Sequence, residues 1–291
     1  MTEKGILRSL KLPNKALMDS WDRIFVPDEV KTRLLSQALL EFTVRGHVSP
    51  ISVPLHGIIL LVGPPGTGKT SLARGLANRV AESLKGPVIH FIEVEPHALA
   101  SSGLGKSQQA VRDLLQKTIS EHASHGPLIV LLDEVETLAP DRKRLSLEAN
   151  PIDVHRATDA VLASVDQLAE AHPHLLFVAT SNFSEAIDYA LLSRADLIES
   201  IGKPEKAGCA AILTDTIEAL GAKWPGILKL LKNPKLAEVV EACIGLDARE
   251  IRKAVVGACT FSKNVALDPN LLTMEDLLRS VRIKHSQGKH L

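Results

Sequence analysis

The sequence is poor in aromatic residues and in cysteine. Phe, Trp and Tyr make up 3% of its 291 residues, so aliphatic side chains must fill the core. Rows of exposed aromatics, which bind single-stranded nucleic acid by stacking, are therefore not expected. The three cysteines, Cys209, Cys243 and Cys259, are an odd number at wide spacing. This pattern favours reduced thiols over disulfides or a zinc site.

An excess of one charge and long apolar runs are also missing. Lys and Arg number 34, as do Asp and Glu, so the formal net charge is zero. Binding to nucleic acid or to anionic membranes relies on massed Lys and Arg, so the balance argues against either partner. Apolar runs such as 58–62 fall far short of the ~18 residues that a membrane-spanning helix needs. Residues 1–18 lack a signal-peptide core, and we expect a cytoplasmic protein.

Strand and helix patterns alternate through the first two thirds of the chain. Short apolar segments rich in β-branched residues are separated by segments with helical periodicity, which predicts a parallel sheet covered by helices on both faces. The expected strands are 58–62, 88–94, 128–133, 175–180 and 197–201, and the expected helices are 28–44, 70–84, 106–122 and 153–169.

The strand pattern stops after Pro204, and only helical patterns follow. Four helices are expected, at 206–220, 235–244, 247–261 and 274–283, two of them with capping boxes, Asp247 with Glu250 and Thr273 with Asp276. We therefore predict three parts: an N-terminal polar arm (1–20), a large α/β domain (21–203) and a small helical domain (204–291).

The strongest motif is GPPGTGKT at 63–70, which matches the phosphate-binding P-loop G-x-x-x-x-G-K-[ST] at every fixed position. Its glycines let backbone N–H groups close around phosphate oxygens, and the following helix adds a partial positive charge. Lys69 is expected to reach the β- and γ-phosphates, and the Thr70 hydroxyl to bind magnesium. The expected nucleotide-binding residues of this segment are Gly63, Pro65, Gly66, Thr67, Gly68, Lys69, Thr70 and Ser71.

Polar residues follow two later strands. Asp133 is expected to hold magnesium, directly or through water, and the adjacent Glu134 to orient and deprotonate the attacking water. Asn182 is a candidate to hold that water near the γ-phosphate, although Asn at a strand end, taken alone, is more typical of a turn. Arg194 precedes the fifth strand and Arg249 opens a helix. Both suit an anion, but each in isolation is more often part of a surface ion pair.

In this order, these elements resemble the core of the AAA+ ATPases. Over residues 12–262 the sequence is more specifically similar to the pachytene-checkpoint family, which remodels HORMA-domain proteins. The stretches DEVE at 133–136, RAD at 194–196 and GLDAREIRK at 245–253 carry this similarity. It implies an α/β AAA+ P-loop core with a five-stranded parallel sheet, a small all-α lid, and ATP and Mg²⁺ as cofactors.

The resemblance also implies roles for single residues. Asn182 would be sensor 1, and Arg194 the arginine finger that reaches the nucleotide of a neighbouring subunit. Arg249 would be sensor 2, contacting nucleotide from the lid. Ser102, Gly103 and Leu104 would lie in the pore loop that grips substrate. Leu104 stands where relatives usually present an aromatic residue, and the alternative for this loop is a flexible Gly/Ser connection.

The predicted function is that of an ATP-hydrolysing, ring-forming remodeller, a homo-oligomer and by family expectation a hexamer. About 20 residues precede Trp21, which resembles the short bacterial members that accompany HORMA proteins in second-messenger antiphage systems. The alternative is a DNA-acting AAA+ ATPase of the clamp-loader or helicase type. It would share every catalytic residue, but the balanced charge counts against it.

Overall fold

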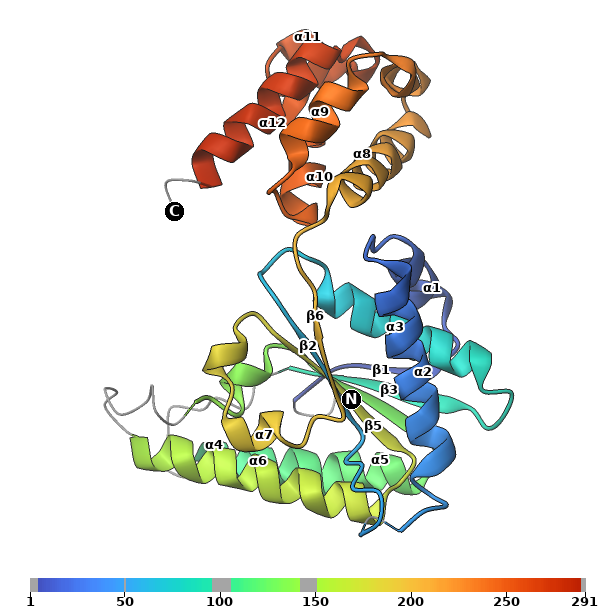
Figure 1. Ribbon diagram of the computed structural model, residues 1–291, viewed down its shortest axis with the longest axis vertical. Coiled ribbons are helices and arrows are strands. Elements are labelled where there is room, and N and C mark those ends of the chain that lie inside the picture. Colours follow the sequence, from blue (N-terminus) through green and yellow to red (C-terminus); the bar gives the residue numbers. More distant parts are fainter. Residues whose placement is uncertain (1–4, 50, 96–105, 142–150, 289–291) are drawn as a thin grey trace. The chain divides into compact units, whose positions relative to one another are not determined.

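The computed structural model describes residues 5–49, 51–95, 106–141 and 151–288. Its sheet has six strands in the order β1-β3-β4-β5-β2-β6 (Figure 1). Five strands run parallel, which confirms the parallel core predicted from the sequence. These are β2 (Ile58–Val62), β3 (Ile89–Val94), β4 (Leu128–Leu132), β5 (Leu175–Ser181) and β6 (Leu197–Ser200).

The sixth strand, β1 (Ile6–Leu12), differs from the predicted polar arm. It pairs antiparallel with β3 at the edge of the sheet. Its first and last residues are 9% and 3% exposed. Between them, Arg8 lies 3.6 Å from the carboxylate of Glu93, which is itself buried. Two residues obscured the alternating pattern: Arg8 lies on the same face of the strand as the buried Ile6 and Leu12, and Leu7 is exposed on the other face.

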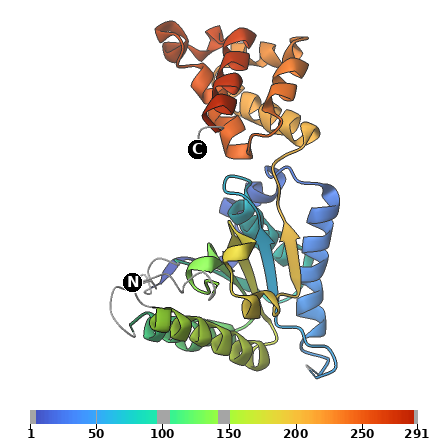
Figure 2. The same cartoon turned by 60° about the vertical axis from the view of Figure 1, so that its left-hand side comes forward.

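Helices cover both faces of the sheet (Figures 1 and 2). On one face lie α2 (Asp28–Val44) and α3 (Lys69–Ser83), with α1 (Lys15–Asp22) packed against α3. On the other lie α4 (Lys106–Arg112) and α6 (Pro151–Ala171). Every residue of β2, β4 and β5 is buried, as expected for a sheet without a solvent face.

The helix predicted at 106–122 is present but changes geometry along its length. After α4 comes a π-helical segment, Asp113–Ile119, and then α5 (Ser120–Ser124). The wider π-helical turns bury Leu114, Leu115 and Ile119 against the same core that contains residues of α6. Hydrophobic periodicity identified this helix, but it did not distinguish a 3.6-residue turn from a wider one.

The described residues form two compact units. The first contains the sheet and its helices as far as Ile201; the second contains the residues from Gly202 on, together with Arg23–Val26 and Pro64–Gly68. Helices build the second unit's core. They are α8 (Lys206–Gly221), α9 (Leu236–Cys243), α10 (Ala248–Ala258), α11 (Lys263–Leu267) and α12 (Met274–Gly288), with 3-10 turns at Pro225–Lys232 and Pro269–Leu271.

The structure of the second unit agrees with two predictions from the sequence, one about a capping box and one about the cysteines. The Asp247 side chain accepts from the Glu250 N–H and the Glu250 side chain from the Asp247 N–H, both at 2.8 Å, which confirms the capping box that starts α10. The three cysteines are free thiols. Burial raises the pKa of Cys243 to about 12, so its thiol stays protonated and unreactive.

The length and hydropathy of the described helices show whether any of them could span a membrane. None of them, in the ranges given above, is both long enough and apolar enough to cross a bilayer.

Glu41 on α2 gives the fold a pH-dependent stability. Its side chain is 1% exposed, and burial, followed by the charge of Asp196, raises its pKa from 4.5 to about 7; the Gln37 hydrogen bond and Arg45 oppose the shift. A carboxyl with a higher pKa in the folded than in the unfolded chain costs stability as the pH rises from about 4.5 to 7, and this cost persists above pH 7.

Glu41→Gln should therefore stabilise the protein at pH 8 and much less at pH 5. The gain at pH 8 has a ceiling of about 3 kcal/mol, which is the free-energy equivalent of the rise in pKa from 4.5 to about 7. Chemical denaturation at both pH values measures the change. Glu29→Gln, at an exposed position of the same helix, is the matched control, and equal effects of Glu41→Gln at both pH values would contradict the prediction.

Candidate active site

The P-loop connects β2 to α3, as predicted. Gly63 directly follows β2 and donates its N–H to the carbonyl of Ser181 at 3.2 Å. Gly66 and Gly68 have φ values of 83° and 96°, a left-handed conformation that L side chains rarely adopt. Helix α3 begins at Lys69, so that its free N–H groups face the loop. Of the other predicted residues, Pro65 and Thr67 lie in the loop, and Thr70 and Ser71 lie in the first turn of α3.

Lys69 brings the P-loop together with the end of β5. Its side chain is buried, and Nζ donates to the carbonyl of Gly63 at 2.8 Å and to Oδ1 of Asn182 at 3.0 Å. Lysine is only a donor, so the amide oxygen of Asn182 must face it and the amide nitrogen must point away. Lys69 and Asn182, which are 113 residues apart in the chain, therefore lie in one site.

Thr70 and Asp133 form the second contact. The Thr70 hydroxyl donates to Oδ1 of Asp133 at 2.8 Å, and the Thr180 hydroxyl donates to the same oxygen. A hydroxyl beside one carboxylate is the donor set with which proteins hold Mg²⁺, because phosphate oxygens and water complete its octahedral shell. The residues present thus fit the ion that the sequence predicts.

Glu134 turns the chain where β4 ends. Its φ and ψ of 51° and 53° are left-handed, which is uncommon for a residue with a side chain and is concentrated at functional sites. The Glu134 N–H donates to the Thr180 hydroxyl at 3.2 Å, and Oε1 accepts from Nδ2 of Asn182 at 3.3 Å. The candidate base and the candidate sensor are therefore in contact.

Glu136 is a residue of the site to which the sequence assigned no role. It lies in the 3-10 turn Val135–Thr137, and its Oε1 accepts from the backbone N–H of Asn182 at 3.1 Å. In the sequence, Glu136 contributed only to the family resemblance, as the last residue of the DEVE stretch. A second acid two residues after Glu134 was the available signal, since one turn can bring both carboxylates toward the neighbouring strand.

Arg194 is held by acceptors of its own unit. Nε and Nη2 donate to the two oxygens of Asp166 at 2.6 and 2.8 Å, and Nη1 donates to the carbonyl of Ala190 at 2.7 Å. The Arg194 guanidinium holds the pKa of Asp166 below its usual range, and the same hydrogen bond raises the pKa of Arg194. Asp166, on α6, is a second residue that the sequence did not reveal.

Arg249 lies beside the P-loop, because its backbone N–H donates to the carbonyl of Gly66 at 3.4 Å. Arg249 is the second residue of α10, after the capping residue Asp247; its contact with nucleotide stays a prediction. Ser102, Gly103 and Leu104 lie outside the described residues, and the pore loop therefore also stays a prediction.

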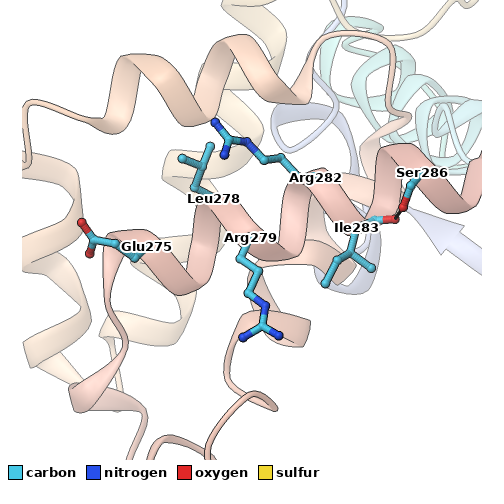
Figure 3. A pocket seen from close by; sticks show the side chains of 6 residues that line it. All are labelled: Glu275, Leu278, Arg279, Arg282, Ile283 and Ser286. Atoms are coloured by element: carbon cyan, nitrogen blue, oxygen red, sulfur yellow. Dashed lines mark hydrogen bonds between the residues drawn. The ribbon is translucent and has the colours of Figure 1, made fainter.

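A shallow cavity of about 600 Å³ lies along α12 of the second unit, where Figure 3 shows its lining. Its two arginines, Arg279 and Arg282, extend in opposite directions in this view. Arg279 lies over the ring of Phe261, 4.6 Å from its centre, and Arg282 pairs with Glu238 at 3.0 Å. The two guanidinium groups do not converge on a common ligand. The cavity is lined by Glu275, Leu278, Arg279, Arg282, Ile283 and Ser286.

Comparison with known proteins agrees with this geometry. Residues 59–203 match the model of the ATPase family associated with various cellular activities (AAA). The chain is 56% identical over 279 residues to CD-NTase-associated protein 6 of Pseudomonas aeruginosa, covering 96% of this chain and 92% of that protein. It is 38% identical over 276 residues to the pachytene checkpoint protein 2 homolog of Arabidopsis thaliana, covering 83% of this chain but only 59% of that longer protein.

A solved structure gives the same result for the fold. In the Escherichia coli MS115-1 HORMA:CdnC:Trip13 complex, one chain superposes with a TM-score of 0.78 at 20% identity, over 95% of this chain and 94% of the other. Fold, P-loop geometry and sequence identity thus agree, and the chain belongs to the AAA ATPase family, in the group that contains CD-NTase-associated protein 6 and the pachytene checkpoint proteins.

Proposed function

We propose that this protein is a cytoplasmic, Mg²⁺-dependent ATPase that assembles into a ring, by family expectation a hexamer, and remodels a HORMA-domain partner in a bacterial second-messenger antiphage system. The contact of Asn182 with both Lys69 and Glu134 carries the ATPase part, because it joins a phosphate-binding ammonium, an amide and a carboxylate in one site. The partner class is supported by the similar chain from a HORMA:CdnC:Trip13 complex, and the antiphage role by the 56% identical CD-NTase-associated protein 6.

Each residue has a task in the proposed hydrolysis. Lys69 and the P-loop N–H groups bind the phosphates. Thr70 and Asp133 would hold Mg²⁺, which when bound offsets the charge of the phosphates. Glu134 accepts a proton from the attacking water, and Asn182 fixes the direction of that carboxylate through its amide nitrogen. Arg194 would complete the site of the next subunit, so that hydrolysis depends on assembly.

The partner class is tested with the Glu134→Gln variant, ATP and purified components. The variant should retain a HORMA-domain protein from the same organism during size-exclusion chromatography, and light scattering of the same peak should give the mass of a ring. Arg142, Lys143 and Arg144 lie outside the described residues but form the chain's most basic cluster. If duplex DNA is retained instead, with an affinity that falls steeply with salt, the protein acts on DNA and the HORMA proposal is wrong.

A further inference from the structure

We infer that Glu136 is a positioning residue for ATP hydrolysis, which holds the backbone of Asn182 so that its amide stays between Lys69 and Glu134. This inference rests on the proposed ATPase function. It assigns to Glu136, the third acid of the DEVE stretch, a task that differs from those of Asp133 and Glu134.

The first argument comes from the way in which β4 and β5 separate. Their backbone pairing reaches Leu132 opposite Ala179, but β5 continues for two more residues. Beyond that point side chains replace the backbone ladder. Asp133 accepts from the Thr180 hydroxyl, the Glu134 N–H donates to the same hydroxyl, and Glu136 accepts from the Asn182 N–H. Glu136 is thus the outermost of three links that continue the pairing into the active site.

The second argument is the rigidity of the turn that carries Glu136. Glu134 reverses the chain through its left-handed conformation, and the N–H and the hydroxyl of Thr137 both donate to its carbonyl at 2.9 Å. Val135, between the two acids, is fully buried. The backbone of Glu136 is therefore fixed. Its hydrogen bond to Asn182 holds the end of β5 in a defined position relative to the end of β4.

The third argument is the use that Glu136 makes of its two oxygens. Oε1 accepts from Asn182, whereas Oε2 is buried and has no hydrogen-bond partner among the residues that the structure describes. A buried acceptor without a partner costs stability and calls for an explanation. The hydrogen bond to Asn182 supplies that explanation. Without this hydrogen bond, the backbone that carries the Asn182 side-chain amide would no longer be held in place.

Kinetics and hydrogen exchange of Glu136→Ala test the inference. Misplacement of a site group by about 1 Å can cost up to ~10²-fold in rate. The variant should therefore lose roughly 10- to 100-fold in kcat, with its KM for ATP unchanged. Hydrogen–deuterium exchange should become faster at the Asn182 amide but not within β5. Glu136→Gln retains an oxygen acceptor, so both its kcat and its exchange protection should stay close to those of the unmodified protein.

Two further variants sharpen the test. Glu95→Ala removes an exposed acid just after β3 and should change nothing. Asn182→Ala combined with Glu136→Ala should be no slower than Asn182→Ala alone, because both changes remove the same positioned amide. Multiplied effects in the double variant, or full protection of the Asn182 amide in Glu136→Ala, would overturn the inference. An unmodified protein that did not hydrolyse ATP would overturn the proposed function instead, while exchange still reported on the Glu136 contact.

Discussion

Arg194→Ala should lower ATP turnover per subunit by roughly 10³- to 10⁵-fold, the usual effect of losing an arginine finger, and should leave nucleotide affinity unchanged. In the structure, the guanidinium donates to Asp166 and Ala190, not to the group formed by Lys69, Asp133 and Asn182. Those three bonds use three of its five N–H groups and leave one on each terminal nitrogen. A rigid guanidinium held along one edge can present these two N–H groups to a phosphate.

Mixed assemblies test whether Arg194 acts on a neighbouring subunit. Lys69→Ala removes phosphate binding but keeps the finger, whereas Arg194→Ala keeps phosphate binding and lacks the finger. Each variant alone should be nearly inactive in a phosphate-release assay. A mixture should recover turnover at junctions where an intact P-loop meets an intact finger. Rising activity per subunit with protein concentration should accompany this recovery, because association creates the junctions.

Arg156→Ala, at an exposed position of α6, is the matched control for loss of a surface arginine and should hydrolyse ATP normally. Mixtures that stay inactive, although each variant still assembles, would show that Arg194 acts within its own subunit or only in folding. Thermal unfolding separates these two cases, since the ion pair with Asp166 is partly solvent-exposed and should contribute at most about 1 kcal/mol to stability.

Periodicity was sufficient to predict the elements that bury large apolar faces. The five parallel strands and most helices lie within a few residues of the predicted bounds, because a strand covered on both faces must be apolar throughout, as Ile58–Val62 and Leu128–Leu132 are. The edge strand Ile6–Leu12 was not predicted, because only one of its two faces is covered. Its arginine is accommodated by a buried partner, Glu93, from another part of the chain.

The residues of the candidate active site were predictable for a different reason. The P-loop glycines and Lys69 are adjacent in sequence, so the chemistry of phosphate binding can be read from one segment. Asp166 and Glu136 could not be found in this way. Their partners Arg194 and Asn182 lie 28 and 46 residues away, and only the sheet order brings them together. A lone acid on a helix, such as Asp166, is usually a solvated charge, and the one local signal for Glu136 is its position two residues after Glu134.

Glu134→Gln should bind ATP with unchanged affinity and hydrolyse it roughly 10²- to 10⁴-fold more slowly, the range that general-base catalysis contributes. The amide has the shape of the carboxylate and keeps an oxygen that can accept from Nδ2 of Asn182, now at 3.3 Å. It cannot take a proton from water at neutral pH. Binding and assembly should therefore persist while the chemical step fails, and the nucleotide-bound ring should accumulate.

Single-turnover measurements with excess enzyme isolate this step from product release. Glu170→Gln, an exposed position near the end of α6, controls for loss of a surface charge and should react at the normal rate. If Glu134→Gln releases phosphate as fast as the unmodified protein, another group must accept the proton. The strained turn at Glu134 would then serve only to place Glu136 beside Asn182, and Glu136→Ala would remain slow although Glu134→Gln was fast.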